Sequence, residues 1–407
     1  MKILIVHNRY QQRGGEDTVV AAEQWLLRSY GHEVELLEAD NDHIRSGVSS
    51  GLAAVQSIYS FNGKRKMREA LQKKRPDLVH VHNFFPTLSP SIFVACSEAK
   101  IPVVHTLHNY RIQCAVNSLY RAGQICEECV ESRSFLPAVR HGCYRSSRAG
   151  SVIVGLTMAL HDQMGTWSSR VSAYIALTSF AAAKMGRFRI PPEKIFVKPN
   201  FASDRGIGDH DGTYALFAGR LTPEKGLQTI LDADAAGALC MDVVIVGDGP
   251  MRPALEQAAA RRGSRLKLKG FVGPDEMLGW MKSARALLMT SLWYEGDPMV
   301  VIEAFSVGLP VIASSISNTA ATVRAEQAGL IYSAGDSIEF SAALQKLASD
   351  NVAARLMSQN ARNYYLATHT PEKNYARLME IYAHAARIAE PAGVEKGQAR
   401  IIANRPV

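Results

Sequence analysis

The sequence lacks a hydrophobic run long enough to cross a bilayer. Its longest apolar stretch, Ala149 to Leu160, is interrupted by Gly, Ser and Thr, whereas a membrane-spanning helix needs about 20 apolar residues in succession. Met1 is followed directly by Lys-Ile-Leu-Ile-Val, which is too short for the apolar part of a signal peptide and is typical of a first strand. We therefore expect a globular protein that is made and kept in the cytoplasm.

Dense blocks of basic residues are also missing, which argues against nucleic acid as a partner. The net charge is nevertheless +8 and the pI is near 9.1, which favours anionic partners such as nucleotides or the inner face of a membrane. Two basic segments, Lys64–Arg68 and residues 133–148, could make peripheral contact with anionic lipid. They could equally be basic faces exposed to solvent.

The dinucleotide fingerprint Gly-x-Gly-x-x-Gly is absent after the first strand, Lys2 to Val6. The turn Gly247-Asp248-Gly249 starts like the fingerprint, but Arg252 occupies the third glycine position. A glycine pair, Gly14-Gly15, does follow the first strand and precedes a helix. Such a pair lets the backbone come close to a phosphate without forming a dinucleotide site.

Strands and helices alternate along both halves of the 407 residues, which is enough chain for two domains of about 150–200 residues each. The content of 47% hydrophobic and 21% charged residues is typical of a globular protein. The pattern predicts an α/β protein with two Rossmann-like parallel-sheet domains that face each other across a cleft. The predicted boundaries are an N-terminal domain (1–201, with a cysteine-rich insert at 109–149), a linker (202–212), a C-terminal domain (213–370), a terminal helix that crosses back (371–389) and a tail (390–407).

The linker contains Asp209-His210-Asp211, which imitates an Asp-x-Asp metal motif. That motif should follow an apolar strand, and this one lies in a polar, glycine-rich joint. We therefore assign it no metal.

The stretch from Ser291 to Val311 organises the second half. An apolar strand precedes it, a polar loop follows with Glu295 and Asp297, and a helix then starts. Asp297 suits the N-cap position and Pro298 the first helical position. The first amides of this helix, at Met299, Val300 and Val301, should bind an anion such as a diphosphate. Because a carboxylate repels phosphate, we expect Glu295 to accept hydrogen bonds from sugar hydroxyls and Glu303 from ribose hydroxyls.

Two cations flank a short turn after an earlier strand, in Gly219-Arg220-Leu221-Thr222-Pro223-Glu224-Lys225-Gly226. Arg220 and Lys225 at the end of a strand can neutralise a diphosphate and stabilise a leaving group. The cation pair would also allow catalysis without magnesium.

These two motifs, Gly-Arg-x4-Lys-Gly and Glu-x7-Glu, resemble the signature of retaining, nucleotide-sugar-dependent glycosyltransferases of family four, in their order and spacing. The resemblance implies the GT-B fold and transfer by front-face attack, without a catalytic cofactor. It implies contact with the donor phosphate for Gly15 and Gly14, and contact with the nucleobase for Phe271 and Val272. It also implies a position near the cleft, in the acceptor region, for Asn200. It also implies that His82, by its ring or backbone, contacts the donor sugar.

Polar residues gather at the expected strand ends of the first half. His82 follows a strand that ends at Val81, and His105, His108 and Asn109 follow one predicted at 101–104. Open α/β sheets bind ligands at the carboxyl ends of their strands. We interpret His105, His108 and Asn109 as part of an acceptor pocket, with a histidine satisfied at a strand end as the alternative for His82.

Four cysteines follow in the pattern Cys-x11-Cys-x2-Cys-x13-Cys: Cys114, Cys126, Cys129 and Cys143. In a cytosolic protein this grouping favours a structural zinc site over disulfides. Only one close pair is present, so free buried thiols or a redox pair remain as alternatives. His141 is an alternative fourth ligand.

The function predicted is transfer of a sugar from a nucleoside-diphosphate sugar to a glycan or lipid-linked acceptor. The resemblance suggests the synthesis of a bacterial surface polysaccharide or lipopolysaccharide. One alternative is a sugar-nucleotide epimerase of the same fold, which would work without an acceptor. Another is a non-catalytic, degenerate transferase that binds a nucleotide or a membrane surface.

Overall fold

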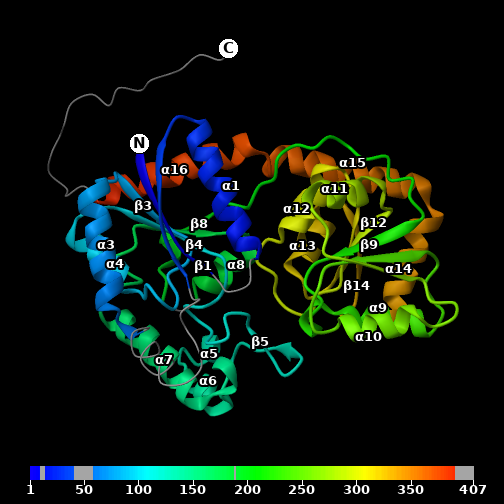
Figure 1. The fold of residues 1–407 in the computed structure, drawn as a ribbon, viewed down its shortest axis with the longest axis horizontal. Helices are drawn as coiled ribbons and strands as arrows, with labels where there is room; N and C mark the ends of the chain where they lie inside the picture. Colours follow the sequence, from blue (N-terminus) through cyan, green and yellow to red (C-terminus); the bar gives the residue numbers. More distant parts are fainter. Residues whose placement is uncertain (10–13, 41–57, 188, 390–407) are drawn as a thin grey trace.

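A computed structural model describes residues 1–9, 14–40, 58–187 and 189–389. The predicted tail, residues 390–407, lies outside the described residues. The chain forms two α/β lobes side by side, with the C-terminal helices running across both (Figure 1). Within the described residues no helix is both long and apolar enough to cross a membrane.

The first lobe contains a six-stranded parallel sheet in the order β2-β1-β3-β4-β7-β8. Its strands are β1 (Lys2–Arg9), β2 (Glu33–Asp40), β3 (Leu78–Val81), β4 (Val103–Leu107), β7 (Ala173–Ala176) and β8 (Ile195–Val197). Its helices are α1 (Gly15–Ser29), α3 (Phe61–Lys74), α4 (Ser91–Glu98), α7 (Arg148–Gln163) and α8 (Ser179–Met185). The predicted parallel α/β domain is therefore confirmed.

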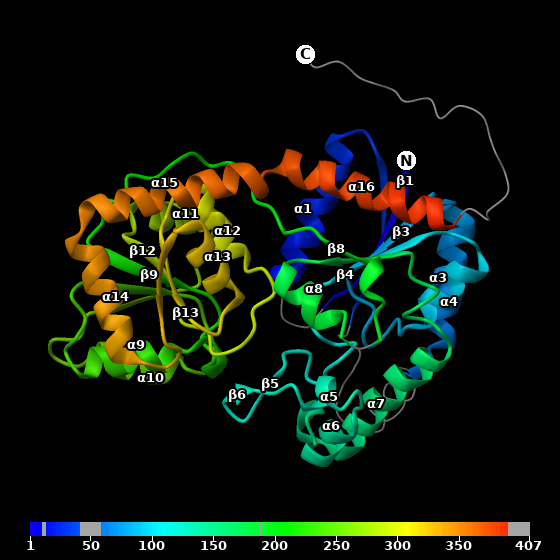
Figure 2. The ribbon, with the colours of Figure 1, turned by 180° about the vertical axis from the view of Figure 1, so that it is seen from behind.

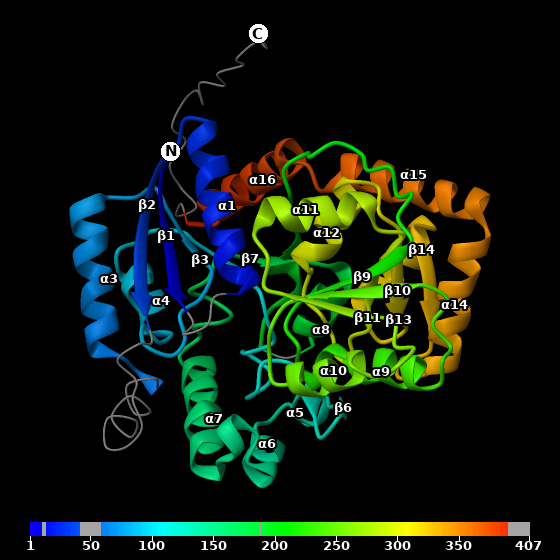
Figure 3. The same ribbon diagram turned by 45° about the vertical axis from the view of Figure 1, so that its right-hand side comes forward.

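The second lobe contains another six-stranded parallel sheet, in the order β11-β10-β9-β12-β13-β14. Its strands are β9 (Tyr214–Ala218), β10 (Asp242–Val246), β11 (Leu266–Gly270), β12 (Ala286–Met289), β13 (Val311–Ser314) and β14 (Gly329–Tyr332). Its helices are α9 (Leu227–Ala235), α10 (Arg252–Ala259), α11 (Pro274–Ser283), α12 (Met299–Ser306), α13 (Asn318–Glu326), α14 (Ser337–Ser349) and α15 (Asn351–Thr368). Figure 3 shows α11 and α12 on one face of this sheet and α9 and α10 on the other.

Alternation along the strands explains why both faces of each sheet are covered. In β1, Leu4 and Val6 join the core cluster that contains α3 and α4, whereas Ile3 and Ile5 face the opposite way. Strands that are apolar on both faces need helices on both sides, which is the packing of a parallel α/β sheet.

The last helix, α16 (Pro371–Ala389), supplies part of the cover of the first sheet. Its residues Leu378, Ile381 and Tyr382 are fully buried with Ile3 and Ile5. Burying a side chain of this size stabilises the fold by about 1.5–3 kcal/mol. Helix α16 follows α15 of the second lobe, so the two helices connect the lobes at the top of the molecule in Figure 1.

The cysteine-rich insert leaves the first lobe after β4 as a series of short elements. These are β5 (Tyr120–Arg121), β6 (Gln124–Ile125), α5 (Glu128–Glu131), α6 (Leu136–His141) and the 3-10 turn Tyr144–Ser146. The β5–β6 hairpin reaches from the insert toward the second lobe (Figure 2).

Two polar segments singled out in the sequence have partners within the fold. Lys64 and Arg68 both pair with Glu98, at 2.7 and 2.6 Å, which neutralises part of that basic segment. His210 of the linker is buried, and its ring nitrogens face the carbonyl oxygens of Val307 and Ala284. It therefore fastens the linker to the second lobe.

Candidate functional site

The strand orders place a topological switch point in each sheet. In the first sheet the order reverses between β1 and β3, and in the second between β9 and β12. Ligands of open α/β sheets bind outside the carboxyl ends of the strands at such points. The segments that leave these four strands carry Gly14, His82, Arg220 and Glu295, so the predicted site residues lie at the two switch points.

Lys225 and Glu295 form a buried ion pair at the second switch point. Lys225 Nζ lies 2.7 Å from Glu295 Oε1, and the side chains are 17% and 7% exposed. The Ser291 hydroxyl donates to the same carboxylate oxygen. Burial alone would raise the pKa of Glu295, but Lys225 and Ser291 outweigh it and hold that pKa below its ordinary value. Glu295 is therefore a carboxylate at neutral pH.

Gly226 allows the turn that carries Lys225 to approach the end of β12. Its φ is +69°, and a Cβ there would lie 1.8 Å from the carbonyl oxygen of Thr290. The Thr290 hydroxyl donates to the Lys225 carbonyl at 2.6 Å, which fixes the contact. A side chain at position 226 would force the two segments apart.

The two cations predicted to act alike are in different situations. Lys225 is already neutralised by Glu295, whereas the Arg220 side chain is 58% exposed and lies 3.9 Å from Glu224. An ammonium group has three donors, so Lys225 can bind a phosphate oxygen while it keeps Glu295. Arg220 is the cation that is open to solvent on this turn.

The prediction that Asp297 caps α12 is wrong. Pro298 is the N-cap and the helix starts at Met299. Val301 N–H already donates to the Pro298 carbonyl at 2.9 Å, so the amides that lack a helical partner by geometry are those of Met299 and Val300.

Asp297 instead joins the two lobes. Its carboxylate accepts from Asn200 N–H at 2.7 Å, and its carbonyl accepts from the Asn200 side-chain amide at 2.9 Å. The Asn200 carbonyl in turn faces His369 Nδ1 at 2.9 Å. Asn200, predicted in the acceptor region, is 3% exposed. Its hydrogen bonds join the two lobes, and we call this contact the Asn200–Asp297 clamp.

The predicted nucleotide contacts differ in exposure. Phe271 is 86% exposed and Val272 partly buried after β11. Glu303 lies within α12, and burial raises its pKa to about 7 against the opposing charge of Arg205. Glu303 therefore changes protonation near neutral pH.

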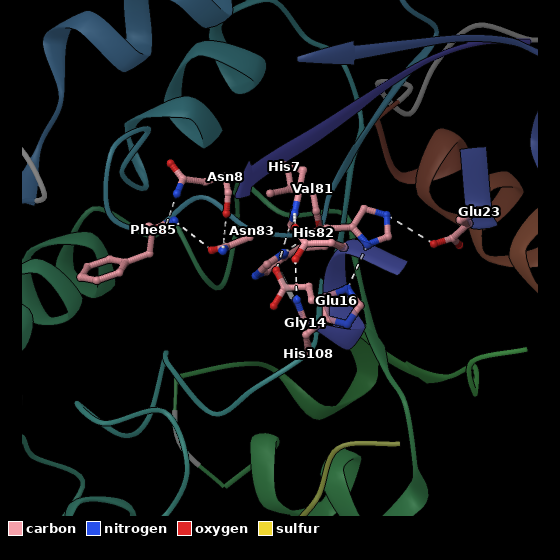
Figure 4. Close-up of polar contacts among 12 residues, drawn as sticks. His7, Asn8, Gly14, Glu16, Glu23, Val81, His82, Asn83, Phe85 and His108 are labelled. Atoms are coloured by element: carbon pink, nitrogen blue, oxygen red, sulfur yellow. Dashed lines mark hydrogen bonds and ion pairs between the residues drawn. The ribbon is translucent and has the colours of Figure 1, made fainter. Parts of the chain in front are cut away.

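Figure 4 shows the His82 ring between Glu23 and His108. Its Nδ1 lies 2.9 Å from His108 Nε2, and its Nε2 lies 3.3 Å from Glu23 Oε2. The other Glu23 oxygen lies 3.2 Å from Lys198 Nζ. Burial, then the neighbouring His80, lowers the pKa of His82 well below its usual value, so the ring is neutral at pH 7. Both nitrogens of the ring face protein groups.

The prediction that His105 follows a strand is also wrong. It lies inside β4 rather than after a strand, because β4 extends to Leu107. Its Nδ1 faces the Val81 carbonyl at 2.9 Å, and its ring contacts Phe84, Phe93 and Tyr174. Burial lowers its pKa to about 4. His105 is a core residue in this structure.

His108 and Asn109 remain partly exposed at the end of β4. A Cβ at Gly296 would lie 3.3 Å from the His108 carbonyl, so the loop of Glu295 packs against this strand end. The side chain of Asn109 accepts from Arg111 N–H at 3.0 Å. Of the histidines predicted in the site, His108 thus lies beside the second lobe.

Gly14 and Gly15 leave open space at the start of α1. A Cβ at either position would meet no atom of the described chain within 4 Å. Gly14 N–H donates to Asp17 at 2.8 Å, and Asp17 also faces His7 at 2.9 Å. Among the described residues nothing fills the space that a side chain here would take, which leaves room for a ligand to approach the backbone.

Sequence reasoning missed three residues that connect the site. Glu23 lies in the middle of α1 and showed no motif. Glu127 of the insert accepts from the Tyr294 hydroxyl at 2.9 Å and pairs with Lys184. Tyr294 directly precedes Glu295, so its position in the central stretch was the one available signal.

The two facing Rossmann-like domains and the meeting of their switch points define the GT-B class of fold. Solved structures share this fold. Sucrose-phosphate synthase from Thermosynechococcus elongatus has a TM-score of 0.69 at 15% identity and covers 95% of this chain and 99% of its own. HepE from Anabaena in complex with UDP-glucose has a TM-score of 0.64 at 17% identity, covering 94% and 99%.

Two family models match the two domains. Residues 8–204 match "Glycosyltransferase Family 4" and residues 212–350 match "Glycosyl transferases group 1". The chain belongs to this family of glycosyltransferases.

Several glycosyltransferases are similar to parts of the chain. One is alpha-D-kanosaminyltransferase of Streptomyces kanamyceticus, 26% identical over 54% of this chain and 64% of the relative. Another is the Escherichia coli UDP-Gal:alpha-D-GlcNAc-diphosphoundecaprenol alpha-1,3-galactosyltransferase, 30% identical over 47% of this chain and 55% of the relative. The chain thus spans less than two thirds of the length of these relatives.

Proposed function

We propose that this chain is a retaining glycosyltransferase that moves a sugar from a nucleoside-diphosphate sugar to a glycan or lipid-linked acceptor. The observation that carries the proposal is the buried Lys225–Glu295 pair at the second switch point. The named relatives support a bacterial glycan product, since one of them uses UDP-Gal and an acceptor on diphosphoundecaprenol. We therefore place the reaction in surface polysaccharide or lipopolysaccharide assembly.

In this proposal the donor diphosphate binds between the exposed Arg220 and the first amides of α12. Lys225 shares its remaining donors with the phosphate while Glu295 keeps it in place. These groups stabilise the negative charge that develops on the leaving phosphate, without a metal ion. The leaving phosphate then accepts the proton of the acceptor hydroxyl on the same face of the sugar, which retains the configuration.

The sugar would lie between Glu295 and the first lobe. Lys225 and Ser291 both bind Oε1 of Glu295, so we assign the contact with a sugar hydroxyl to Oε2. His82 would act through His108, since its ring nitrogens face His108 and Glu23. His108 and Asn109 would then face the acceptor. This role differs from a direct contact of the His82 ring with the sugar.

Donor affinity should depend on pH through Glu303. With a pKa of about 7, the carboxylate that accepts from ribose hydroxyls is lost as the pH falls, so the Kd for the donor should rise about tenfold between pH 8 and pH 6. Titration calorimetry at pH 6, 7 and 8 measures this change. In Glu303→Gln the Kd for the donor should be higher than in the native chain and independent of pH. If the Kd of the variant still changes with pH as in the native chain, Glu303 is not the group responsible.

The effect of Glu303 on folding stability has the opposite pH dependence. Because the pKa of Glu303 is raised in the folded protein, its contribution to stability is full below the unfolded pKa and is lost as the pH rises through about 7. Glu303→Gln should therefore lose less stability than the native chain between pH 6 and pH 8.

The test of the function is a thermal-shift screen with UDP-, GDP- and ADP-sugars, followed by product analysis. A donor at 100 times its Kd should add about 2.7 kcal/mol of stability. Transfer should then require an acceptor. A converted sugar nucleotide formed without acceptor would indicate an epimerase, and no shift with any donor would contradict the proposal.

A further inference from the structure

The insert brings four cysteines together from different short elements. Cys114 follows a turn after β4, Cys126 follows β6, Cys129 lies in α5, and Cys143 follows α6. Backbone hydrogen bonds hold each segment: Cys114 N–H donates to Tyr110, Cys126 N–H to Leu119 and Cys143 N–H to Ala138, at 2.8–3.0 Å. Residues 29 positions apart in the sequence are thereby fixed around one point.

All four cysteines line one small cavity of about 20 Å³. Its other walls are mainly apolar, with Ala115, Leu119 and Ala138 among them. All six cysteines of the chain are free thiols. The volume suits one ion and excludes a substrate, because a cavity of this size holds about one water molecule.

We propose that Cys114, Cys126, Cys129 and Cys143 bind one structural zinc ion. Four thiols would lose their protons on binding and form four Zn–S bonds, which leaves no open position for catalysis. Zn–S bonds of about 2.3 Å require sulfurs about 3.8 Å apart. Across the described part of the chain no three cysteine sulfurs lie within 4.8 Å of one another, so the ion would draw the segments inward.

The structure decides between the two candidates for the fourth ligand. His141 Nε2 faces Glu128 at 3.1 Å and is not part of the cavity wall. Cys143 is part of that wall. Arg121 also lines the cavity, where it pairs with Glu128 at 2.6 Å.

Another buried group has the right residue types but the wrong surroundings. Ligand atoms of Glu23, His80 and His82 lie within 4.8 Å of one another. Lys198 already supplies a cation 3.2 Å from Glu23. Both ring nitrogens of His80 contact hydroxyls, of Tyr382 and Thr106, at 2.7 Å. The cysteine cavity is therefore the metal site that we assign.

A zinc ion in this cavity would also stabilise the contact between the insert and the loop that carries Glu295. Glu127 lies between Cys126 and Cys129, and its carboxylate accepts from the hydroxyl of Tyr294, next to Glu295. Fixing the two neighbouring cysteines fixes the backbone of Glu127. The metal would thus support the site without touching the substrate.

The test is metal content of the full chain purified without chelator. Mass spectrometry of the metal should give about one zinc per chain, and Cys126→Ser/Cys129→Ser should give less than about a tenth of that. Cys240→Ser, in the second lobe, is the matched control and should keep its zinc.

A second measurement on the unmutated chain does not depend on how the variant folds. Replacement by Co²⁺ should give the absorption of a tetrahedral four-thiolate centre. Thiol titration of the unfolded chain should count six free thiols. No zinc together with no cobalt spectrum, or a thiol count lowered by disulfides, would overturn the proposal.

Discussion

Lys225→Met is expected to lower kcat/KM by a factor of about 10²–10³, because one charged donor to a leaving group is removed. The lysine is one of two cations at the second switch point, and its ammonium group is held by Glu295 at 2.7 Å. Steady-state kinetics with a saturating acceptor measures the loss. Lys267→Met, an exposed lysine on β11 that is outside the site, is the control.

The stability of the same variant separates chemistry from folding. Without Lys225, the Glu295 carboxylate is buried and unpaired, which costs about 3 kcal/mol. The double variant Lys225→Met/Glu295→Gln should recover part of this loss without recovering activity. Activity near that of the native chain in Lys225→Met would remove the proposed phosphate contact.

Glu295→Gln is expected to lower kcat by about 10²-fold, because the amide cannot supply the negative charge that orients Lys225 and polarises the sugar. Gln is close to Glu in size and can still accept from Ser291, so the fold should persist. Circular dichroism and thermal unfolding check this. A variant with unchanged turnover would eliminate Glu295 from the mechanism.

Glu295→Ala should behave differently from Gln, and the structure gives the reason. Alanine removes both the charge and the hydrogen-bond acceptor that Lys225 faces. Because Lys225 is 17% exposed and would lose its partner, we expect the Ala variant to lose about 3 kcal/mol of stability as well as activity. Chemical denaturation of the Ala and Gln variants, compared side by side, measures the difference.

The sequence by itself determined the two parallel sheets and the location of the motifs. Apolar runs of four to six residues, separated by helical segments, predict the strands and helices. This periodicity is local, so it can be recognised in the sequence without knowledge of tertiary contacts. Glycines and charged residues after such runs lie at strand ends, so Arg220, Lys225 and Glu295 could be assigned to the same edge of the second sheet. The order and spacing of two motifs then indicated the family.

Only the tertiary structure decided which partners these residues have. The Lys225–Glu295 pair, the Asn200–Asp297 clamp and the engagement of His82 by His108 and Glu23 all join segments far apart in the chain. A residue's type and spacing say where along a strand it lies. They do not say which distant segment packs against it, because that depends on how the sheets and lobes come together.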